Sequence, residues 1–161
     1  LCSGFLLMPS PAPGSHTHMM SALAEARSAA SRGEVPVGAV IVAADGTILA
    51  RAGNRTRELN DPTAHAELLA IRAACGLRGS ERLQTCDLYV TLEPCPMCAG
   101  AIAAARIRRL YYGASDPKSG GVETGPRVFS HANCHHAPEV YAGIAEQEAA
   151  LLLRSFFAAK R

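Results

Sequence analysis

Apolar residues recur along this chain at two spacings, and the spacing changes from one segment to the next. Intervals of three and four residues are typical of helices, and they predict four of them, at about 18–32, 63–74, 96–105 and 144–157. Gly33 is the expected stop of the first helix. Asp61 or Thr63 is the expected N-cap of the second helix, and Gly76 lies beyond its expected end.

Short β-branched or apolar runs fall between these helices and predict four strands, at about 35–43, 47–52, 88–92 and 109–113. Asp45-Gly46 predicts a tight hairpin turn between the first two strands. Helices separate the later strands, which favours parallel pairing. We therefore expect an α/β fold of three layers, α/β/α, with a mixed central sheet made of an N-terminal hairpin and parallel strands. The position of a last strand after Ser130 stays open.

The composition is that of one globular domain. The chain has 161 residues, of which 48% are hydrophobic and 19% charged. Its formal net charge of +2 is too small to indicate nucleic-acid binding by itself. No apolar run is long enough to span a bilayer, so no membrane association is expected.

The first residues differ in character from the rest. Leu1–Met8 is apolar but short and lacks a basic flank, so we do not expect a signal peptide. Several prolines follow, and the chain begins with Leu. We interpret residues 1–15 as a tail, disordered or of vector origin, and residues 16–161 as a single domain.

Six cysteines occur, and six would allow 15 disulfide pairings. A chain of this length and hydrophobicity folds without disulfides, and no secretory signal is seen. We therefore expect free thiols in a cytoplasmic protein, where thiolates can serve as metal ligands.

Two short segments carry the candidate chemistry, His65-Ala66-Glu67 and Pro94-Cys95-Pro96-Met97-Cys98. One histidine and two cysteines provide three ligands for a tetrahedral zinc ion, and a catalytic zinc ion takes water as the fourth. Glu67 is not needed to hold the metal and is the expected proton carrier. This combination of segments is typical of zinc nucleobase deaminases. The expected cofactor is one Zn²⁺ per subunit.

The expected reaction follows from these groups. A zinc ion lowers the pKa of bound water from about 15.7 to about 7. Glu67 would take the proton and pass it to a ring nitrogen, the zinc hydroxide would attack the neighbouring carbon, and ammonia would leave after Glu67 protonates the amine. Both segments are expected to open helices. Residues 65 and 67 share no helical face, so the pocket must wrap the helix end.

A structural zinc site is the alternative, because such sites have a fourth protein ligand. The candidates are Cys86 and a cluster further along the chain, made of His131, Cys134, His135 and His136. That cluster is also a candidate second metal site, or only an exposed polar loop.

The chain resembles the bacterial tRNA-specific adenosine deaminases, within the cytidine deaminase-like superfamily. The resemblance covers His18–Arg161 and is densest at Glu34–Val40, Gly53–Arg55, Asp61–Glu67 and Leu88–Ala101. It implies a homodimer that converts adenosine to inosine at the wobble position of a tRNA anticodon, chiefly that of an arginine tRNA. It also implies zinc ligands at His65, Cys95 and Cys98 and a proton shuttle at Glu67.

The resemblance further implies RNA contacts. Asn54 would contact the flipped nucleotide, Asp116 and Lys118 would meet the anticodon backbone, and Phe156-Phe157 would lie near the RNA. Each has a structural alternative, because Asn54 and Asp116 also suit turns and the two phenylalanines also suit a core. Basic residues at 106, 108 and 109 could contact phosphates or be merely solvated. The segment 123–137 departs from the family pattern.

Two other functions stay open. A small-molecule deaminase acting on guanine, cytosine or a free nucleoside would share the zinc segments. A zinc-stabilised binding module without catalysis would share the ligands but would not need Glu67.

Overall fold

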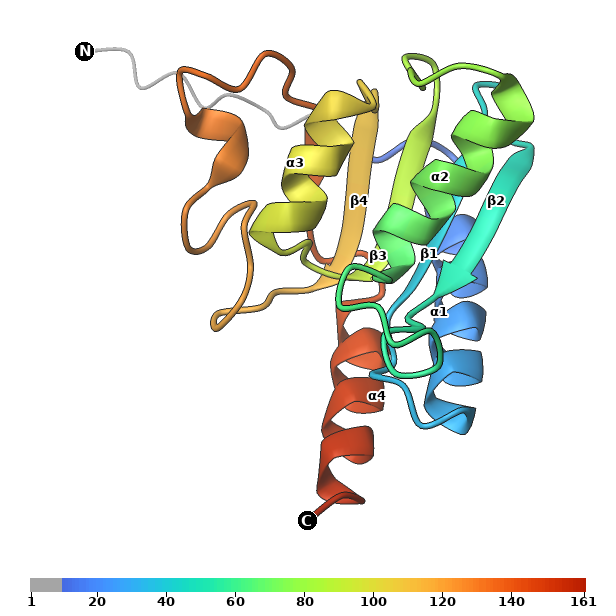
Figure 1. Ribbon diagram of the computed structural model, residues 1–161, viewed down its shortest axis with the longest axis vertical. Helices are drawn as coiled ribbons and strands as arrows, with labels where there is room; N and C mark the ends of the chain where they lie inside the picture. The colour runs from blue at the N-terminus through green and yellow to red at the C-terminus, as the bar shows by residue number, and fades with distance from the viewer. Residues whose placement is uncertain (1–9) are drawn as a thin grey trace.

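The computed structural model describes residues 10–161, in which helices cover both faces of a five-stranded sheet (Figure 1). No helix in this range has both the length and the hydrophobicity needed to cross a bilayer. In chain order, the elements are α1 (Ser15–Ser31), β1 (Gly38–Val42), β2 (Ile48–Gly53), α2 (Ala66–Arg78), β3 (Asp87–Leu92), α3 (Pro96–Ala104), β4 (Arg109–Ala114), the 3₁₀ helix η1 (Val128–Ser130), β5 (Glu139–Tyr141) and α4 (Glu146–Ala158).

The sheet is mixed, with the strand order β2-β1-β3-β4-β5. β1 pairs antiparallel with β2 and with β3, whereas β3, β4 and β5 are parallel. At the hairpin turn, the backbone N–H of Thr47 donates to Asp45 Oδ1 at 2.9 Å, and Gly46 has a φ of +89°. The expected hairpin and parallel strands are therefore confirmed.

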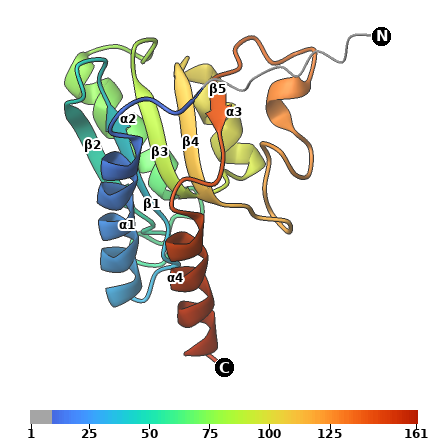
Figure 2. The ribbon, with the colours of Figure 1, turned by 180° about the vertical axis from the view of Figure 1, so that it is seen from behind.

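The helices form two layers, with α2 and α3 on one face of the sheet and α1 and α4 on the other (Figures 1 and 2). Alternate residues of each strand pack against the two helix layers in turn, because successive side chains of a strand point to opposite faces of the sheet. In β1, Ala39 and Ile41 pack in the core under α2 and α3, whereas Val40 and Val42 pack in the core under α1 and α4. The three-layer α/β/α prediction is confirmed.

Close packing joins α1 to the sheet at Gly38. A Cβ atom at this position would overlap the carbonyl oxygen of Ala22 and lie 2.5 Å from the backbone nitrogen of Ala26. Only glycine lets the helix backbone lie directly on the strand here. This contact fixes the start of β1, which borders the site described below.

The limits of α2 differ from the sequence prediction. The helix begins at Ala66 with His65 as N-cap, and Asp61 Oδ1 instead accepts hydrogen bonds from the backbone and hydroxyl of Thr63. At its other end the helix continues through Gly76 to Arg78. Gly79 ends it, because its φ of +62° is the left-handed conformation that helix C-caps adopt.

The last strand, whose position after Ser130 the sequence leaves open, is β5. β5 has only three residues and pairs parallel with β4, with Val140 opposite Leu110. Glu139 accepts a hydrogen bond from the Arg109 guanidinium at 3.1 Å, and this pair joins the two strands at one end. The last helix begins two residues later than expected, after Ala145, whose φ is +55°.

The proposed boundary between tail and domain, at residues 15 and 16, lies at the start of α1. α1 begins at Ser15, and the backbone N–H of Ala12 donates to the Tyr111 hydroxyl at 3.4 Å. Ala12 also packs against the core between the sheet, α1 and α4. The part of the proposed tail before Ser10 lies outside the described residues.

Candidate active site

Two helices begin at candidate metal ligands. His65 is the N-cap of α2 and Cys95 is the N-cap of α3, and both have extended backbone conformations. Neither side chain caps its own helix, so the imidazole and the thiol are free to bind elsewhere. Cys98 follows in the first turn of α3. The N-terminal ends of both helix dipoles therefore lie at the candidate site, where they favour thiolates.

The three expected ligands lie together in a geometry that suits zinc. His65 Nδ1 is 3.7 Å from Cys95 Sγ and 3.6 Å from Cys98 Sγ. A tetrahedral zinc ion with Zn–N near 2.0 Å and Zn–S near 2.3 Å would separate N from S by about 3.5 Å. Within residues 10–161, no other group of three His, Cys, Asp or Glu side chains lies close enough to hold an ion.

Glu67 lies beside these ligands, in the first turn of α2, and is only 4% exposed. Burial raises the pKa of its carboxyl group to about 7. Its Oε2 has no hydrogen-bond partner among the described residues, although a buried polar atom normally has one. Such an orphaned oxygen next to three metal ligands fits a site in which a water molecule completes the coordination of zinc.

The backbone conformation of His65 explains how residues 65 and 67 can face one pocket. Two helical residues at this spacing point to different sides. His65, however, has φ −75° and ψ 150°, outside the helical region, and only Glu67 is within α2. The pocket lies at the end of the helix, as the sequence argument requires.

The two thiols have opposite pKa shifts. A hydrogen bond from Cys98 lowers the pKa of Cys95 to about 4, although burial opposes this shift. The same hydrogen bond, together with burial, raises the pKa of Cys98. A zinc ion bound here would hold both groups as thiolates and displace their protons.

Asn54 connects the site to the start of α2. Its Oδ1 accepts a hydrogen bond from the backbone N–H of Ala66 at 2.9 Å, and the residue is buried. This bond satisfies a backbone N–H of the first turn that His65 leaves uncapped. Because the oxygen is occupied, the Asn54 amide NH₂ group is the part that remains for a ligand.

These residues line a cavity of about 220 Å³. It holds five of the expected site residues, Asn54, His65, Glu67, Cys95 and Asp116. The other residues that line it are ones that the sequence does not single out: Val35, Val37, Thr56, Leu92, Glu93 and Ser119. Asp116 also makes the turn expected as its alternative role, because its Oδ1 accepts from the backbone N–H groups of Lys118 and Ser119.

A larger groove of about 960 Å³ adjoins the cavity and shares four residues with it, Val35, Leu92, Asp116 and Ser119. The far side of this groove is the C-terminal part of α4, and its basic residues are Lys118, Arg154, Lys160 and Arg161. Phe157 lines the groove and is 48% exposed. Phe156 is not among the lining residues, because its ring lies edge-on against Phe157 and under the Lys160 ammonium group.

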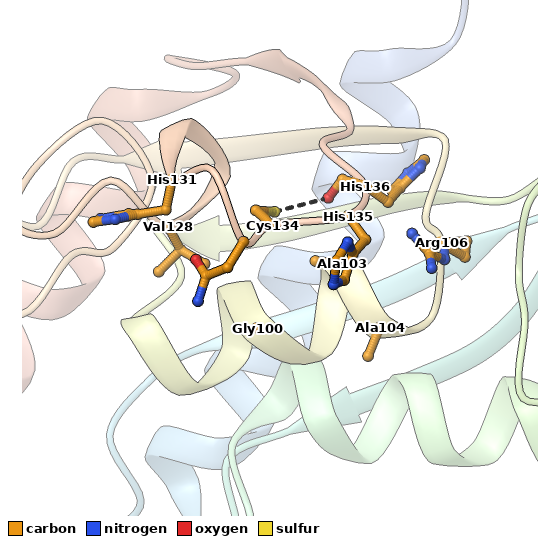
Figure 3. A pocket seen from close by; sticks show the side chains of 10 residues that line it. Gly100, Ala103, Ala104, Arg106, Val128, His131, Cys134, His135 and His136 are labelled. Carbon is orange, nitrogen blue, oxygen red and sulfur yellow. Dashed lines mark hydrogen bonds between the residues drawn. The ribbon is translucent and has the colours of Figure 1, made fainter.

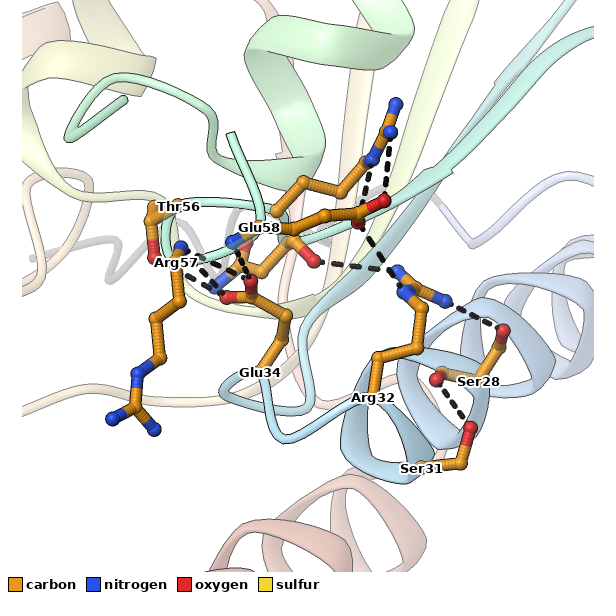
Figure 4. Close-up of polar contacts among 9 residues, drawn as sticks. Ser28, Ser31, Arg32, Glu34, Thr56, Arg57 and Glu58 are labelled. Atoms are coloured by element: carbon orange, nitrogen blue, oxygen red, sulfur yellow. Dashed lines mark hydrogen bonds and ion pairs between the residues drawn. The ribbon is translucent and has the colours of Figure 1, made fainter. Parts of the chain in front are cut away.

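Two buried glutamates support the walls of the cavity, and the sequence interpretation assigns no role to either. Glu34 accepts hydrogen bonds from the backbone N–H groups of Arg57 and Glu58 and from the Thr56 hydroxyl (Figure 4). Glu93 binds residues 116–124 in the same way. Burial raises the pKa of the Glu93 carboxyl group, but hydrogen bonds from these residues more than offset it, and the net shift is downward. A charged residue directly after the apolar run Leu88–Leu92 is the signal that could have indicated Glu93.

The second candidate metal site is not formed (Figure 3). Cys134 Sγ donates to the carbonyl oxygen of His136, and His136 Nε2 lies 2.6 Å from the carbonyl oxygen of Ile107. His131 bonds the carbonyl oxygen of Pro126 instead. These side chains are engaged separately with backbone groups, so they line a cavity of about 480 Å³ beside α3 without meeting at one point.

Other candidate residues lie away from the site. Arg108 makes two hydrogen bonds of 2.9 Å to the Asp87 carboxylate, and Arg109 pairs with Glu139. These residues lie at the N-terminal ends of β3, β4 and β5, whereas Cys95 follows the C-terminal end of β3. Cys86, just before β3, is likewise excluded as a fourth metal ligand.

Comparison with known proteins identifies the domain. Residues 14–114 match the family model of the cytidine and deoxycytidylate deaminase zinc-binding region. The chain is 66% identical over 146 residues to a tRNA-specific adenosine deaminase of Agrobacterium fabrum, which covers 90% of this chain and 95% of the relative.

Solved structures agree with this assignment. A structure from a study of A-to-I editing by tRNA:A34 deaminases has a TM-score of 0.83 and 65% identity, covering 85% of this chain and 99% of that chain. A guanine deaminase of Bacillus subtilis has a TM-score of 0.59 and 46% identity, covering 62% of this chain and 63% of that chain. The chain is therefore a zinc-dependent deaminase that belongs to the cytidine and deoxycytidylate deaminase family and, within it, to the tRNA-specific adenosine deaminases.

Proposed function

We propose that this enzyme converts adenosine to inosine at the wobble position 34 of a tRNA anticodon, by hydrolysis and with release of ammonia. The observation that carries the proposal is the juxtaposition of the three metal donors with Glu67, whose buried Oε2 has no protein partner in residues 10–161. High similarity to relatives named for this reaction supports the choice of substrate.

In this mechanism His65, Cys95 and Cys98 would hold the zinc ion. When bound, the ion activates water for attack by lowering its pKa to about 7. Glu67 would accept a proton from the attacking water and deliver it to the ring nitrogen beside the reacting carbon. It would later take the proton of the hydroxyl group added to that carbon and pass it to the departing amine, so that ammonia leaves as the carbonyl group forms. A carboxyl group with a pKa near 7 suits this double role, because it can hold or release a proton at neutral pH.

The substrate nucleotide would leave the anticodon loop and enter the cavity. Unstacking one base costs a few kcal/mol, and less in a loop whose bases are already splayed. The free NH₂ group of Asn54 would donate to the flipped nucleotide, and Asp116 at the mouth of the cavity would contact its ribose or the adjoining backbone. Lys118 would then lie along the same RNA strand in the groove.

The groove also suggests which aromatic residue contacts RNA. The resemblance implied that Phe156-Phe157 lie near the RNA, and Phe157 is the one of the two that lines the groove. We propose that Phe157 meets the unpaired bases and that Phe156 supports it edge-on, at 5.4 Å between ring centroids. Stacking of a base on an aromatic ring contributes about 1–3 kcal/mol.

The test is direct. The full chain is incubated with an arginine tRNA that carries adenine at position 34, and the product is sequenced for inosine. Glu67→Gln, which preserves the shape of the side chain, is the matched control and should leave the tRNA unedited. Absence of inosine with the zinc-loaded wild-type chain would defeat the proposal.

A second candidate is deamination of a free base, which the similarity to a guanine deaminase favours. Release of ammonia from guanine, cytosine or free adenosine, with none from tRNA, would support this alternative. The groove next to the cavity argues against this alternative, because a free base in the cavity would not reach the basic residues that line the groove.

We also propose a homodimer that uses the outer face of α3. The helix carries no charged side chain, and Met97, Gly100 and Ala104 are exposed on it. A helix that is apolar on all sides is normally buried, and a second copy of the chain would cover it. Ala104→Glu should convert a dimer into a monomer in sedimentation velocity. Ala24→Glu, the same change at an exposed position of α1, should not. A monomeric wild-type protein would contradict the proposal.

The remaining expectations are the choice of an arginine tRNA and a cytoplasmic location. A panel of tRNAs with adenine at position 34 tests the first. The second is supported by five free cysteines in the described chain, since a reducing compartment keeps thiols available for zinc.

A further inference from the structure

Glu93 is a buried carboxylate that the deamination mechanism does not use. It follows the C-terminal end of β3, lies two residues before Cys95, and is 2% exposed. A buried charge is expensive unless several donors satisfy it. The hydrogen-bond donors around Glu93 therefore indicate its structural role.

Its hydrogen-bond donors come from residues 116–124, here called the 116–124 loop. Glu93 Oε1 accepts from the backbone N–H of Asp116 at 3.2 Å. Glu93 Oε2 accepts from the backbone N–H groups of Val122, Glu123 and Thr124 at 3.1–3.2 Å. One carboxylate thus ties both ends of the loop to the end of β3.

The Thr124 hydroxyl closes the loop on itself. It lies 2.9 Å from Glu93 Oε2 and 2.9 Å from the carbonyl oxygen of Asp116, and it donates its single proton to one of them. The backbone of Asp116 is held on both sides, at its N–H by Glu93 and at its carbonyl oxygen by the backbone N–H of Gly120, which donates to it at 2.9 Å.

The same loop rests directly on the segment that carries Cys95. The backbone N–H of Gly121 donates to the carbonyl oxygen of Pro94 at 2.8 Å. A Cβ atom at Gly121 would lie 2.6 Å from the backbone nitrogen of Pro96, closer than packed atoms allow. The loop therefore has little freedom to shift relative to the candidate zinc ligands.

We propose that Glu93 is a positioning residue for substrate binding, which sets Asp116 and Ser119 at the mouth of the cavity and Lys118 in the groove. The inference rests on the proposed function, because the loop matters only if a substrate extends beyond the cavity. Glu93 touches no reacting atom. It acts through the 116–124 loop, so its loss should weaken binding of RNA more than it slows the chemical step.

Glu93→Gln gives a sharp test, because an amide can replace only one of the two oxygens. If its oxygen takes the position of Oε2, its NH₂ group faces the N–H of Asp116, and two donors meet. The Asp116 end of the loop should be released while the other end stays bound. With an anticodon stem-loop substrate, we expect KM to rise about tenfold and kcat to change less than about twofold.

Hydrogen exchange provides a readout that needs no activity. The amide protons of the 116–124 loop should exchange faster in Glu93→Gln, while zinc content stays at one ion per chain. Asp87→Asn is the matched control, because it removes a buried carboxylate from the opposite end of β3, where Arg108 binds it. It should leave both KM and loop exchange unchanged.

The outcomes separate the hypotheses. An unchanged KM, or unchanged exchange of the loop, in a folded Glu93→Gln chain overturns the proposal, and so does an equal rise of KM in Asp87→Asn. If Glu93→Gln does not fold, Thr124→Val removes one donor and should raise KM in the same direction to a smaller degree; an unchanged KM there overturns the proposal. If the wild type edits no RNA, the proposed function fails, and the exchange measurement still decides whether Glu93 holds the loop.

Discussion

The buried carboxyl group of Glu67 lowers the stability of the fold but suits catalysis. Burial disfavours its ionised form and raises its pKa to about 7, and no donor in residues 10–161 satisfies its Oε2. Both properties suit a proton carrier, because a raised pKa makes the carboxyl group a better proton acceptor and its free oxygen has no competing partner. Stability and activity therefore make opposite demands on this position.

At the same position, Glu67→Gln should separate activity from stability. We expect kcat to fall by about 10²–10⁴, the contribution typical of general acid–base catalysis. Zinc content, measured by atomic absorption, should stay at one ion per chain. The midpoint of thermal unfolding should not fall, because the change removes a buried charge without leaving a cavity. A loss of zinc together with activity would mean that Glu67 holds the metal.

Among the elements, α2 and α3 share an arrangement that explains the site. Each has a candidate metal ligand at its N-cap, and neither side chain caps its helix. Asn54 supplies a cap for α2 from the end of β2, by accepting the Ala66 N–H. Asn54, which follows β2, thus caps α2 in place of His65 and leaves the His65 imidazole available to a metal ion.

The two glycines at the end of α2 allow a matched test of its limits. Gly76 is inside the helix with open space around its Cα, so Gly76→Ala should raise the free energy of unfolding by about 0.5–1 kcal/mol. Gly79 has a φ of +62°, so Gly79→Ala should lower it by about 1–2 kcal/mol. Urea denaturation measures both. Equal effects would contradict the assigned end of the helix.

Sequence patterns predicted the order of the elements well, because β-branched runs and apolar spacing depend on local preferences. They located α2 but not its ends. Judged by local sequence, Asp61 suits the N-cap as well as His65 does, and Gly76 suits the C-terminal end as well as Gly79 does. They left the position of the last strand open, because β5 has only three residues, which carry no periodicity and are held by pairing with β4. They identified the three candidate metal ligands that the structure brings together, but not Glu93, whose hydrogen-bond donors lie 23–31 residues away.

For the whole molecule, the candidate metal ligands with Glu67 and most of the larger groove come from different parts of the chain. The family match ends at Ala114 and includes the metal donors and Glu67. The 116–124 loop and α4 follow it and form most of the groove. The net charge of +2 hides this organisation, because four basic residues gather along the groove while other arginines are paired elsewhere, as Arg108 is with Asp87.

This distribution makes the salt dependence of RNA binding a test at the scale of the molecule. Removing one basic side chain that binds a phosphate of a single-stranded region should reduce the slope of log K against log salt concentration by about 0.7. We expect Arg154→Gln, in the groove, to weaken binding and to reduce the slope by about this amount. Arg82→Gln should change neither, because Arg82 precedes β3 at the opposite edge and pairs with Glu81. Fluorescence anisotropy with a labelled anticodon stem-loop measures both variants. Equal effects would mean that RNA responds to net charge alone, whereas an effect confined to Arg154 would place the RNA strand along α4.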